Sequence, residues 1–284
     1  MIRWLVTGAA GMLGRDLVPV LSEHGSVTAA DRAALDLTEP AAVAAATVAG
    51  HDVVINTAGW TDVDGAEADE AAATEVNGHA VARLARACDH AGALLIQLST
   101  DYVFDGTATS PIPEDAPTNP INAYGRSKLV GEQAVREILP RTGYIVRTAW
   151  LYGAHGRNFV KTMLRLAVER ETVDVVDDQR GQPTWTRALA RQLAALGEAA
   201  VRGTAPPGIY HGTAAGAASW YELARAVFEL AGHDPNRVRP VSSAEFPRPA
   251  PRPAYSVLGH GRWALAGIPP QPHWRDQLAA ANLT

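Results

Sequence analysis

A tyrosine and a lysine four residues apart are the side chains of this sequence best suited to chemistry. They begin and end the run Tyr124-Gly125-Arg126-Ser127-Lys128, and on a helix this spacing places both on one face. An ammonium group beside a phenol lowers the pKa of the phenol and makes it a better proton donor to a developing alkoxide. The chain has only two lysines among its 25 basic residues, and an arginine here would not release its proton. The pair predicts acid catalysis at a carbonyl group.

A second polar group, Ser99-Thr100-Asp101-Tyr102, ends an apolar run at residues 93–100. Taken alone, Thr100 is a hydroxyl that caps the end of a strand. Together with Tyr124 and Lys128, it is better explained as a third catalytic residue that donates a hydrogen bond to a substrate carbonyl oxygen. Asp101 and Tyr102 are placed to hold sugar hydroxyls.

The first apolar run leads into a glycine-rich loop, Gly8-Ala9-Ala10-Gly11-Met12-Leu13-Gly14. Gly8 permits a tight turn, Gly11 lets a phosphate approach the amides at a helix N-terminus, and Gly14 allows close packing of helix on strand. The position of the loop between a strand and a helix makes the pattern specific. We therefore predict that this loop, with Met12 and Leu13, binds the pyrophosphate of a dinucleotide.

Asp31 and Arg32 end the second apolar run. An acid at this point binds the ribose hydroxyls of NAD, whereas a nearby arginine accommodates the extra phosphate of NADP, so the choice between NADH and NADPH stays open. Asp36 and Leu37 either hold the adenine ring or, for Asp36, place a carboxylate at the start of a helix. After the third run, the small residues of Asn56–Gly59 leave space for a cofactor or form a plain turn.

These residues need a parallel sheet to bring them together. Nearly continuous apolar runs predict strands, and amphipathic patterns between them predict helices, so the class is α/β with a Rossmann-type doubly wound parallel sheet. We expect an NAD(P)-binding domain at 1–150 and a smaller substrate-binding part at 151–284, interleaved with the first. The predicted strands are 2–7, 26–31, 52–58, 93–100 and 144–149, and the predicted helices are about 12–24, 39–49, 67–91, 122–138, 157–171, 186–200 and 219–232.

The composition excludes several classes of partner. A formal net charge of -5 over 284 residues leaves no basic footprint for nucleic acid or an anionic membrane. No apolar run approaches the roughly 20 residues that span a bilayer. With Cys88 as the one cysteine, no intramolecular disulfide can form. We expect a cytoplasmic protein that binds neither nucleic acid nor membrane.

Five segments together resemble the dTDP-4-dehydrorhamnose reductase family of extended short-chain dehydrogenases/reductases, and the Ser99–Gly106 run is the most specific. The resemblance implies reduction of the C4 keto group of dTDP-4-dehydro-6-deoxy-L-mannose to dTDP-L-rhamnose with NADPH or NADH. The segments are Thr61–Glu67, Ser99–Gly106, Tyr124–Lys128 with Gly131 and Glu132, Arg147–Tyr152, and Asp178–Thr184.

The resemblance also implies roles for single residues. The catalytic positions are Thr100, Tyr124 and Lys128. The sugar-binding positions are Val63, Thr100, Asp101, Tyr124 and Trp150. The cofactor positions are Gly8, Gly11, Met12, Leu13, Gly14, Asp31, Arg32, Asp36, Leu37, Ala58, Gly59, Trp60 and Lys128.

The chain departs from the family at two places. Trp60 stands where members often have tyrosine, and Arg15 stands where some members have an acid that holds a magnesium ion between two subunits. We therefore predict no metal and a monomer or weak homodimer. In the Pro-rich stretch at 246–253, Arg248 and Arg252 either meet the substrate diphosphate or are solvated.

Three other functions remain open. The chain could reduce a different dTDP-4-keto-deoxysugar in antibiotic biosynthesis, because residues near the hydride site do not decide the sugar. It could be a non-catalytic NADP-binding regulatory subunit, although such proteins usually lack the tyrosine–lysine pair. It could also be an epimerase or dehydratase, although no glutamate follows Asp101.

Overall fold

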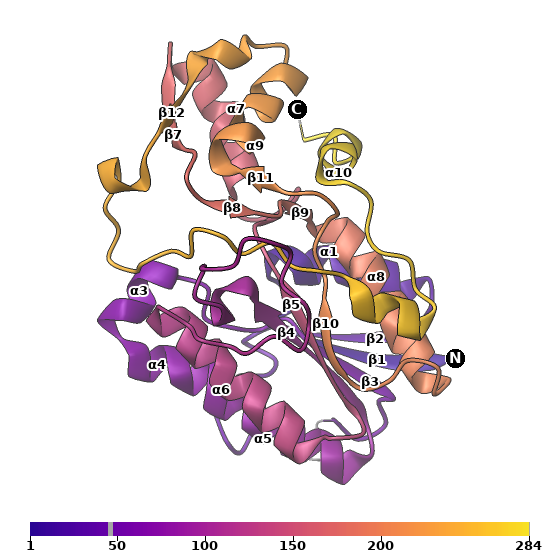
Figure 1. Cartoon of the computed structure of the whole chain (residues 1–284). Helices are drawn as coiled ribbons and strands as arrows, with labels where there is room; N and C mark the ends of the chain where they lie inside the picture. The colour runs from indigo at the N-terminus through magenta and orange to yellow at the C-terminus, as the bar shows by residue number, and fades with distance from the viewer. Residues whose placement is uncertain (45–47, 284) are drawn as a thin grey trace.

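The computed structural model describes residues 1–44 and 48–283, and its centre is a parallel sheet in the order β10-β5-β4-β3-β1-β2 (Figure 1). All neighbouring strands are parallel. The chain reverses its direction across the sheet between β1 and β3, which is where such folds bind ligands. This confirms the predicted doubly wound sheet. The strands are β1 (Ile2–Thr7), β2 (Gly25–Ala30), β3 (Val53–Asn56), β4 (Leu94–Thr100), β5 (Gly143–Thr148) and β10 (Gly208–His211).

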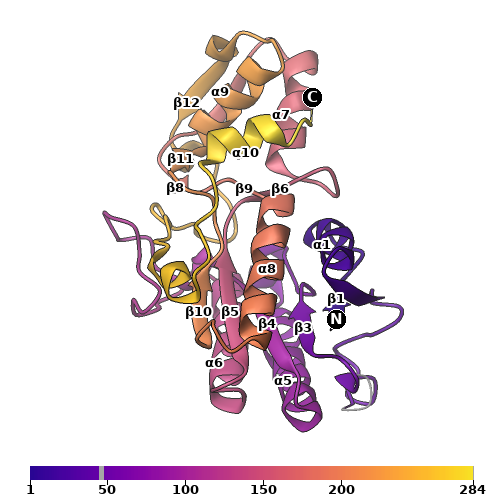
Figure 2. The same cartoon turned by 90° about the vertical axis from the view of Figure 1, so that its right-hand side faces the viewer.

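Helices cover both faces of this sheet. On one face lie α1 (Met12–Ser22) and α8 (Thr186–Val201), and on the other lie α5 (Ala80–Ala91) and α6 (Ala123–Ile138). Figure 2 shows α1 and α8 toward the viewer, with α5 and α6 behind. The helix α8 approaches closely because it has Gly197, where a Cβ would lie 2.4 Å from the ring of Trp4. The two faces give the sheet two apolar cores, as nearly continuous apolar strands require.

The segment between β3 and α5 differs from the prediction. A single helix at 67–91 is wrong, because the chain forms α3 (Val63–Ala68), α4 (Glu70–Thr74) and a π-helical turn (Glu75–His79) before α5. The break is at Asp69, whose side chain accepts a hydrogen bond from the amide of Ala72 and so starts a new helix. Of the helix predicted at about 39–49, residues 40–43 form turns and a bend, 45–47 lie outside the described residues, and Val48 is helical.

Part of the chain beyond residue 150 forms a second lobe above the sheet, with its own apolar core (Figures 1 and 2). Its helices are α7 (Phe159–Glu169), α9 (Trp220–Leu230) and α10 (Trp274–Ala280). Its short strands pair as β7 (Val173–Val176) with β12 (Val238–Val241), β6 (Leu151–Tyr152) with β9 (Thr184–Trp185), and β8 (Arg180–Gly181) with β11 (Ala218–Ser219). The 3-10 helices of the chain are Asp101–Val103, Pro235–Arg237, Ser243–Glu245 and Gly261–Ala266.

The later part of the chain also returns to the sheet. Helix α8 packs on the sheet, and β10 adds an edge strand beside β5 that the sequence patterns did not predict. The division at residue 150 therefore stays a prediction about function, while in space the two parts interleave. Among the described residues, no helix is long and apolar enough to cross a membrane.

Candidate active site

A cavity of about 720 Å³ lies at the carboxyl ends of the central strands, beneath the second lobe. It gathers residues that the sequence analysis had selected from six separate segments. The predicted residues that line it are Gly8, Gly11, Met12, Leu13, Asp31, Arg32, Asp36, Leu37, Ala58, Gly59, Val63, Thr100, Asp101, Tyr124, Lys128 and Trp150. Such convergence at a topological switch point is typical of a ligand-binding site.

The glycine-rich loop has the shape that a dinucleotide requires. Gly8 has a φ of +68°, and a Cβ there would lie 2.5 Å from the amide nitrogen of Ala58. Gly14 does not line the cavity but packs under the loop, where a Cβ would lie 2.6 Å from the carbonyl oxygen of Gly8. Helix α1 is fully described and has no acidic residue in its first turn. Its N-terminus, from Gly11, therefore fits the pyrophosphate of NAD(P)H.

The loop after β2 keeps its charges in local contacts. Asp36 accepts hydrogen bonds from the amide and hydroxyl of Thr38, at 2.9 and 2.6 Å, and from Nε of Arg32 at 3.1 Å. The hydroxyl of Thr38, its amide and Arg32 lower the pKa of Asp36 to about 2. These contacts favour a turn-forming role for Asp36, while the Arg32 side chain is 84% exposed at the cavity edge and free to meet a ligand.

Tyr124 lies in the first turn of α6, and two neighbours determine its position. Asn122 caps the helix by accepting a 2.8 Å hydrogen bond from the amide of Gly125. Position 125 has no room for a side chain, because a Cβ on Gly125 would lie 2.1 Å from the carbonyl oxygen of Tyr102. The start of α6 can therefore sit directly against the 3-10 turn that follows β4. Tyr124 and Thr100, at the end of β4, meet at this junction.

Burial dominates the titration of the catalytic pair. It raises the pKa of Tyr124 to about 12, while hydrogen bonding with Thr100 acts to lower that pKa. The predicted lowering of the tyrosine pKa is therefore wrong for this structure. Burial lowers the pKa of Lys128 to about 8, with the charge of Glu132 acting against it. Tyr124 thus keeps its proton at neutral pH, as a proton donor must.

A buried ion pair stands behind Lys128. Glu132 lies one turn further along α6, and its carboxylate accepts hydrogen bonds from Arg147 at 2.9 and 2.7 Å and from Ser99 at 2.5 Å. Glu132 and Arg147 are each only 2% exposed. Since Arg147 neutralises Glu132, little negative charge is left to hold the proton of Lys128. The sequence patterns had not indicated this pair.

Asp101 also bonds to protein groups, and its predicted contact with sugar hydroxyls stays a prediction. It lines the cavity, but it is 2% exposed and its carboxylate accepts hydrogen bonds from Thr100 at 3.1 Å and from Ser256 at 2.5 Å. Burial raises the pKa of Asp101 to about 6, against those two hydrogen bonds. In this structure Asp101 holds the end of β4 to the C-terminal segment.

Two stacked tryptophans form the opposite wall of the cavity. Trp150 has a φ of +47°, and its ring lies 3.5 Å from that of Trp220 at an interplanar angle of 9°. Trp220 is the first residue of α9. It follows the N-cap residue Ser219, which forms a capping box with Glu222. The sequence analysis selected Trp150 but missed Trp220 and Arg157, which also lines the cavity. No spacing rule connects tryptophans 70 residues apart.

Three residues that were candidates for ligand contacts in the sequence do not line the cavity. Trp60 packs near Ala66 and Tyr124 with its indole nitrogen donating to the carbonyl oxygen of Asp62, so its cofactor role stays a prediction. Arg248 and Arg252 lie against Asp64 and do not line the cavity. Among the described residues, no three His, Cys, Asp or Glu side chains converge as metal ligands.

Comparison with known proteins gives a consistent result. The family described as "RmlD substrate binding domain" matches residues 2–282. The chain is 57% identical over 279 residues to a dTDP-4-dehydrorhamnose reductase of Streptomyces griseus, covering 97% of this chain and 91% of that one. It is 54% identical over 282 residues to a dTDP-4-keto-6-deoxy-D-glucose reductase of Streptomyces niveus, covering 98% and 96%.

The fold matches solved structures of the same kind. A dTDP-4-dehydrorhamnose reductase from Bacillus anthracis, crystallised in complex with NADP, superposes with a TM-score of 0.93 and 38% sequence identity. The match covers 99% of each chain.

Proposed function

The chain belongs to the RmlD substrate binding domain family, and from that premise we propose that it reduces the C4 keto group of dTDP-4-dehydrorhamnose to give dTDP-L-rhamnose. The observation that carries the proposal is the meeting of Thr100, Tyr124 and Lys128 in one cavity with the glycine-rich loop. A full-length relative at 57% identity has this activity in its name. The chain is an NAD(P)H-dependent oxidoreductase.

The residues of the chain divide the work of reduction. Bound NAD(P)H supplies the hydride that the keto carbon receives. Tyr124 gives its phenolic proton to the carbonyl oxygen as negative charge develops there, and it carries that proton at neutral pH. Thr100 holds the same oxygen by turning its hydroxyl away from Asp101, to which it now donates. Removal of water by the second lobe strengthens both contacts.

Lys128 supports Tyr124 after the proton has left. Its ammonium lies beside Gly59, where a Cβ would approach the lysine nitrogen to 3.5 Å. That place, between the end of β3 and α6, suits a group that holds the nicotinamide ribose while its charge stabilises the phenolate. The glycine-rich loop with Met12 and Leu13 holds the pyrophosphate, and Arg32 meets the 2′-phosphate when NADPH is bound.

The sugar ring lies against Trp150, with Val63 on α3 opposite. Both side chains line the cavity, and the stack of Trp150 on Trp220 offers a rigid apolar face to a deoxysugar. We include in the proposal a cytoplasmic location and a monomer or weak homodimer that binds neither nucleic acid nor membrane.

A second keto-sugar is the candidate that a specific observation favours. The 54% identical relative from Streptomyces niveus is named for dTDP-4-keto-6-deoxy-D-glucose, which differs from the first substrate in stereochemistry and not in the reacting group. The same residues would carry that reaction.

The decisive experiment measures oxidation of NADH and NADPH in separate reactions with each of the two keto-sugars, and identifies the products by NMR. Rapid oxidation with dTDP-4-dehydrorhamnose and formation of dTDP-L-rhamnose is the expected result. Turnover of only dTDP-4-keto-6-deoxy-D-glucose would make that sugar the substrate in place of dTDP-4-dehydrorhamnose. Binding of NAD(P)H with no turnover of either would favour a regulatory subunit.

A further inference from the structure

The Pro-rich stretch Phe246–Tyr255, which we call the arm, crosses from the second lobe to the catalytic end of the sheet (Figure 1). Its four prolines remove backbone donors, so side chains and carbonyl groups must hold it in place. Pro253 also packs on Gly106, where a Cβ would lie 2.6 Å from it. The arm is therefore fastened at a few identifiable points.

Asp64 on α3 is the main point of attachment. Its carboxylate accepts a 2.5 Å hydrogen bond from Arg252 and a 3.2 Å bond from the amide of Ala250, and Arg248 lies 3.7 Å away. Hydrogen bonding by Arg252 lowers the pKa of Asp64 despite partial burial. The Arg252 side chain is only 17% exposed, against 66% for Arg248. Since solvent screens the Asp64–Arg252 pair poorly, it is the stronger contact.

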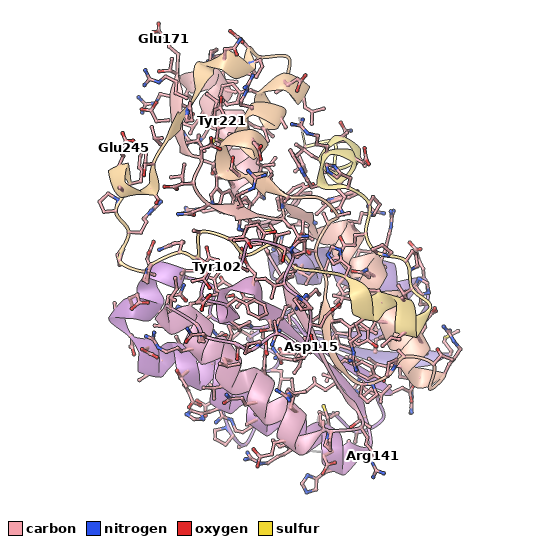
Figure 3. The ribbon with its side chains drawn as sticks, in the orientation of Figure 1. Tyr102, Asp115, Arg141, Glu171, Tyr221 and Glu245 are labelled. Carbon is pink, nitrogen blue, oxygen red and sulfur yellow. The ribbon has the colours of Figure 1, made fainter. Side chains whose placement is uncertain are left out.

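Arg252 also reaches the wall of the active site. Its guanidinium lies near the phenol of Tyr102: burial raises the pKa of Tyr102, and the positive charge of Arg252, followed by its hydrogen bonding, opposes that rise. The ring of Tyr102 in turn meets the ring of Tyr124 edge to face, with centroids 6.0 Å apart and planes at 82°. A chain of contacts thus runs from Asp64 through Arg252 and Tyr102 to Tyr124. Figure 3 shows Tyr102 where the arm passes α3, at the junction of the two lobes.

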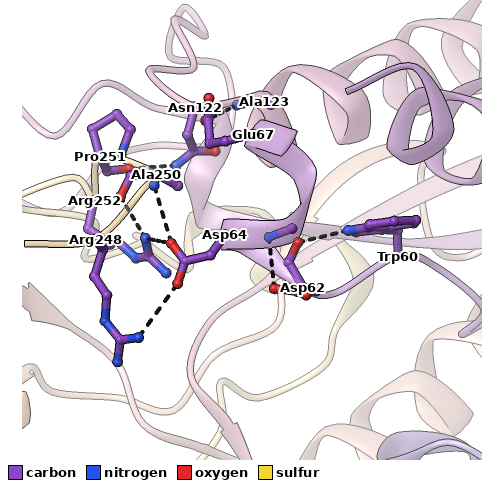
Figure 4. Close-up of polar contacts among 11 residues, drawn as sticks. Trp60, Asp62, Asp64, Glu67, Asn122, Ala123, Arg248, Ala250, Pro251 and Arg252 are labelled. Carbon is purple, nitrogen blue, oxygen red and sulfur yellow. Dashed lines mark hydrogen bonds and ion pairs between the residues drawn. The ribbon is translucent and has the colours of Figure 1, made fainter. Parts of the chain in front are cut away.

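Two further bonds connect the same elements to the start of α6. The side-chain amide of Asn122 donates a 2.9 Å hydrogen bond to the carbonyl oxygen of Pro251, while its oxygen caps the helix. Glu67 of α3 accepts a 2.7 Å bond from the amide of Ala123. The arm, α3 and the catalytic helix therefore form a closed triangle of contacts (Figure 4).

We propose that Asp64 and Arg252 are positioning residues for proton transfer: they clamp the arm to α3 and, through Tyr102, hold the ring of Tyr124 in its place beside Thr100. Neither residue touches substrate in this role. The kinetic part of the inference rests on the proposed reduction. It replaces the alternative that Arg252 binds the substrate diphosphate, which would predict an effect on the KM for the sugar and none on kcat.

The test is a double-mutant cycle on the purified full-length enzyme with Arg252→Met, Tyr102→Phe and the double variant. We expect each single change to lower kcat roughly tenfold with the KM values for the sugar and for NADPH unchanged, and the double variant to lose no more than either, because both act through one contact. Rates are expressed per NADPH-binding site. Arg239→Met on β12 is the matched control, since it breaks an exposed 2.7 Å pair with Asp174 of β7. Losses that multiply in the double variant would overturn the proposal.

Hydrogen exchange gives a second readout that needs no substrate. We expect faster exchange in Arg252→Met than in Arg239→Met for peptides covering 101–104 and 119–126, where the amides of Phe104, Asn119 and Gly125 bond to Asp101, Val103 and Asn122. Unchanged exchange there, or a fall in melting temperature with kcat per site intact, would mean that the arm is only structural. If the wild type reduces neither sugar, the proposed function fails, and the exchange result alone decides the clamp.

Discussion

The two sides of the cavity are built from the sequence in different ways. The cofactor side consists of short loops that directly follow β1, β2 and β3, so Gly8–Gly14, Asp31 to Leu37 and Ala58–Gly59 meet because neighbouring parallel strands end at one edge. The sugar side is held together by contacts between distant residues, some of them behind the lining: Trp150 with Trp220, Asp101 with Ser256, and Asp64 with Arg252, which are 70, 155 and 188 residues apart.

This difference explains what can vary within the family. The conformation of a loop between a strand and a helix is determined by the glycines within the loop, and the sheet fixes its position. A wall made from two lobes depends on how the lobes pack, so a change far along the chain can alter the sugar pocket without touching the cofactor.

The largest expected effect comes from changing Tyr124, which lies where the cofactor side and the sugar side of the cavity meet. Tyr124→Phe removes the proton donor and keeps the ring, so kcat should fall by about 10²–10⁴ with NADPH binding unchanged. Steady-state kinetics and a fluorescence titration of NADPH measure the two quantities. Tyr221→Phe, on α9 and away from the cavity lining, should behave as wild type. A Tyr124→Phe enzyme with normal turnover would remove Tyr124 from the mechanism.

The pH dependence of activity tests Lys128, which lies on α6, the helix that joins the two sides of the cavity. Burial lowers the pKa of Lys128 to about 8, so the ammonium is present below that pH and is lost above it. The value of kcat/KM, which reports on the free enzyme, should therefore fall about fivefold between pH 8 and pH 9 and then about tenfold for each further pH unit. Lys128→Arg, which stays charged, should have lower activity without this limb. A flat profile to pH 9.5 in the wild type would contradict the assignment.

The tryptophan stack tests the independence of the sugar side. Trp220→Ala leaves Trp150 without its stacking partner, and a loss of about 1.4 kcal/mol in sugar binding raises the KM for the sugar about tenfold. The KM for NADPH should stay within about twofold of the wild type. Trp220→Phe should recover most of the loss because it restores a flat ring. Equal changes in the KM for the sugar and the KM for NADPH would mean that the sugar side is not independent of the cofactor side.

Sequence patterns predicted the site best where chemistry and local geometry coincide. Thr100, Tyr124 and the glycine loop were recognised because the end of a strand or the turn of a helix already determines where such side chains point. Residue Glu132 was missed as a partner of Arg147, and Trp220 as a partner of Trp150, because only packing of distant elements brings them together. The pKa of Tyr124 was predicted in the wrong direction since spacing shows the lysine but not the burial.

The same reasoning explains the errors in the fold. Five strands of the central sheet follow from apolar runs in the sequence, whereas β10 is a short strand, Gly208–His211, that comes directly after two prolines. Its place at the edge depends on β5, with which it pairs from Gly208 to His211. The break of the helix at Asp69 required knowledge of its side-chain bond to Ala72, which a period of 3.6 residues does not contain.

The smallest expected effect concerns the choice of cofactor. Arg32 is 84% exposed and its contact with Asp36 is a surface pair, so Arg32→Ala should change the melting temperature little. Loss of a partner for the 2′-phosphate should raise the KM for NADPH a few-fold, by about 1 kcal/mol, and leave the KM for NADH unchanged. Arg187→Ala, an exposed arginine on α8, is the control. If both cofactors weaken equally, Arg32 acts by holding Asp36 and the loop after β2, and the cofactor side would then depend on its side-chain contacts as much as the sugar side does.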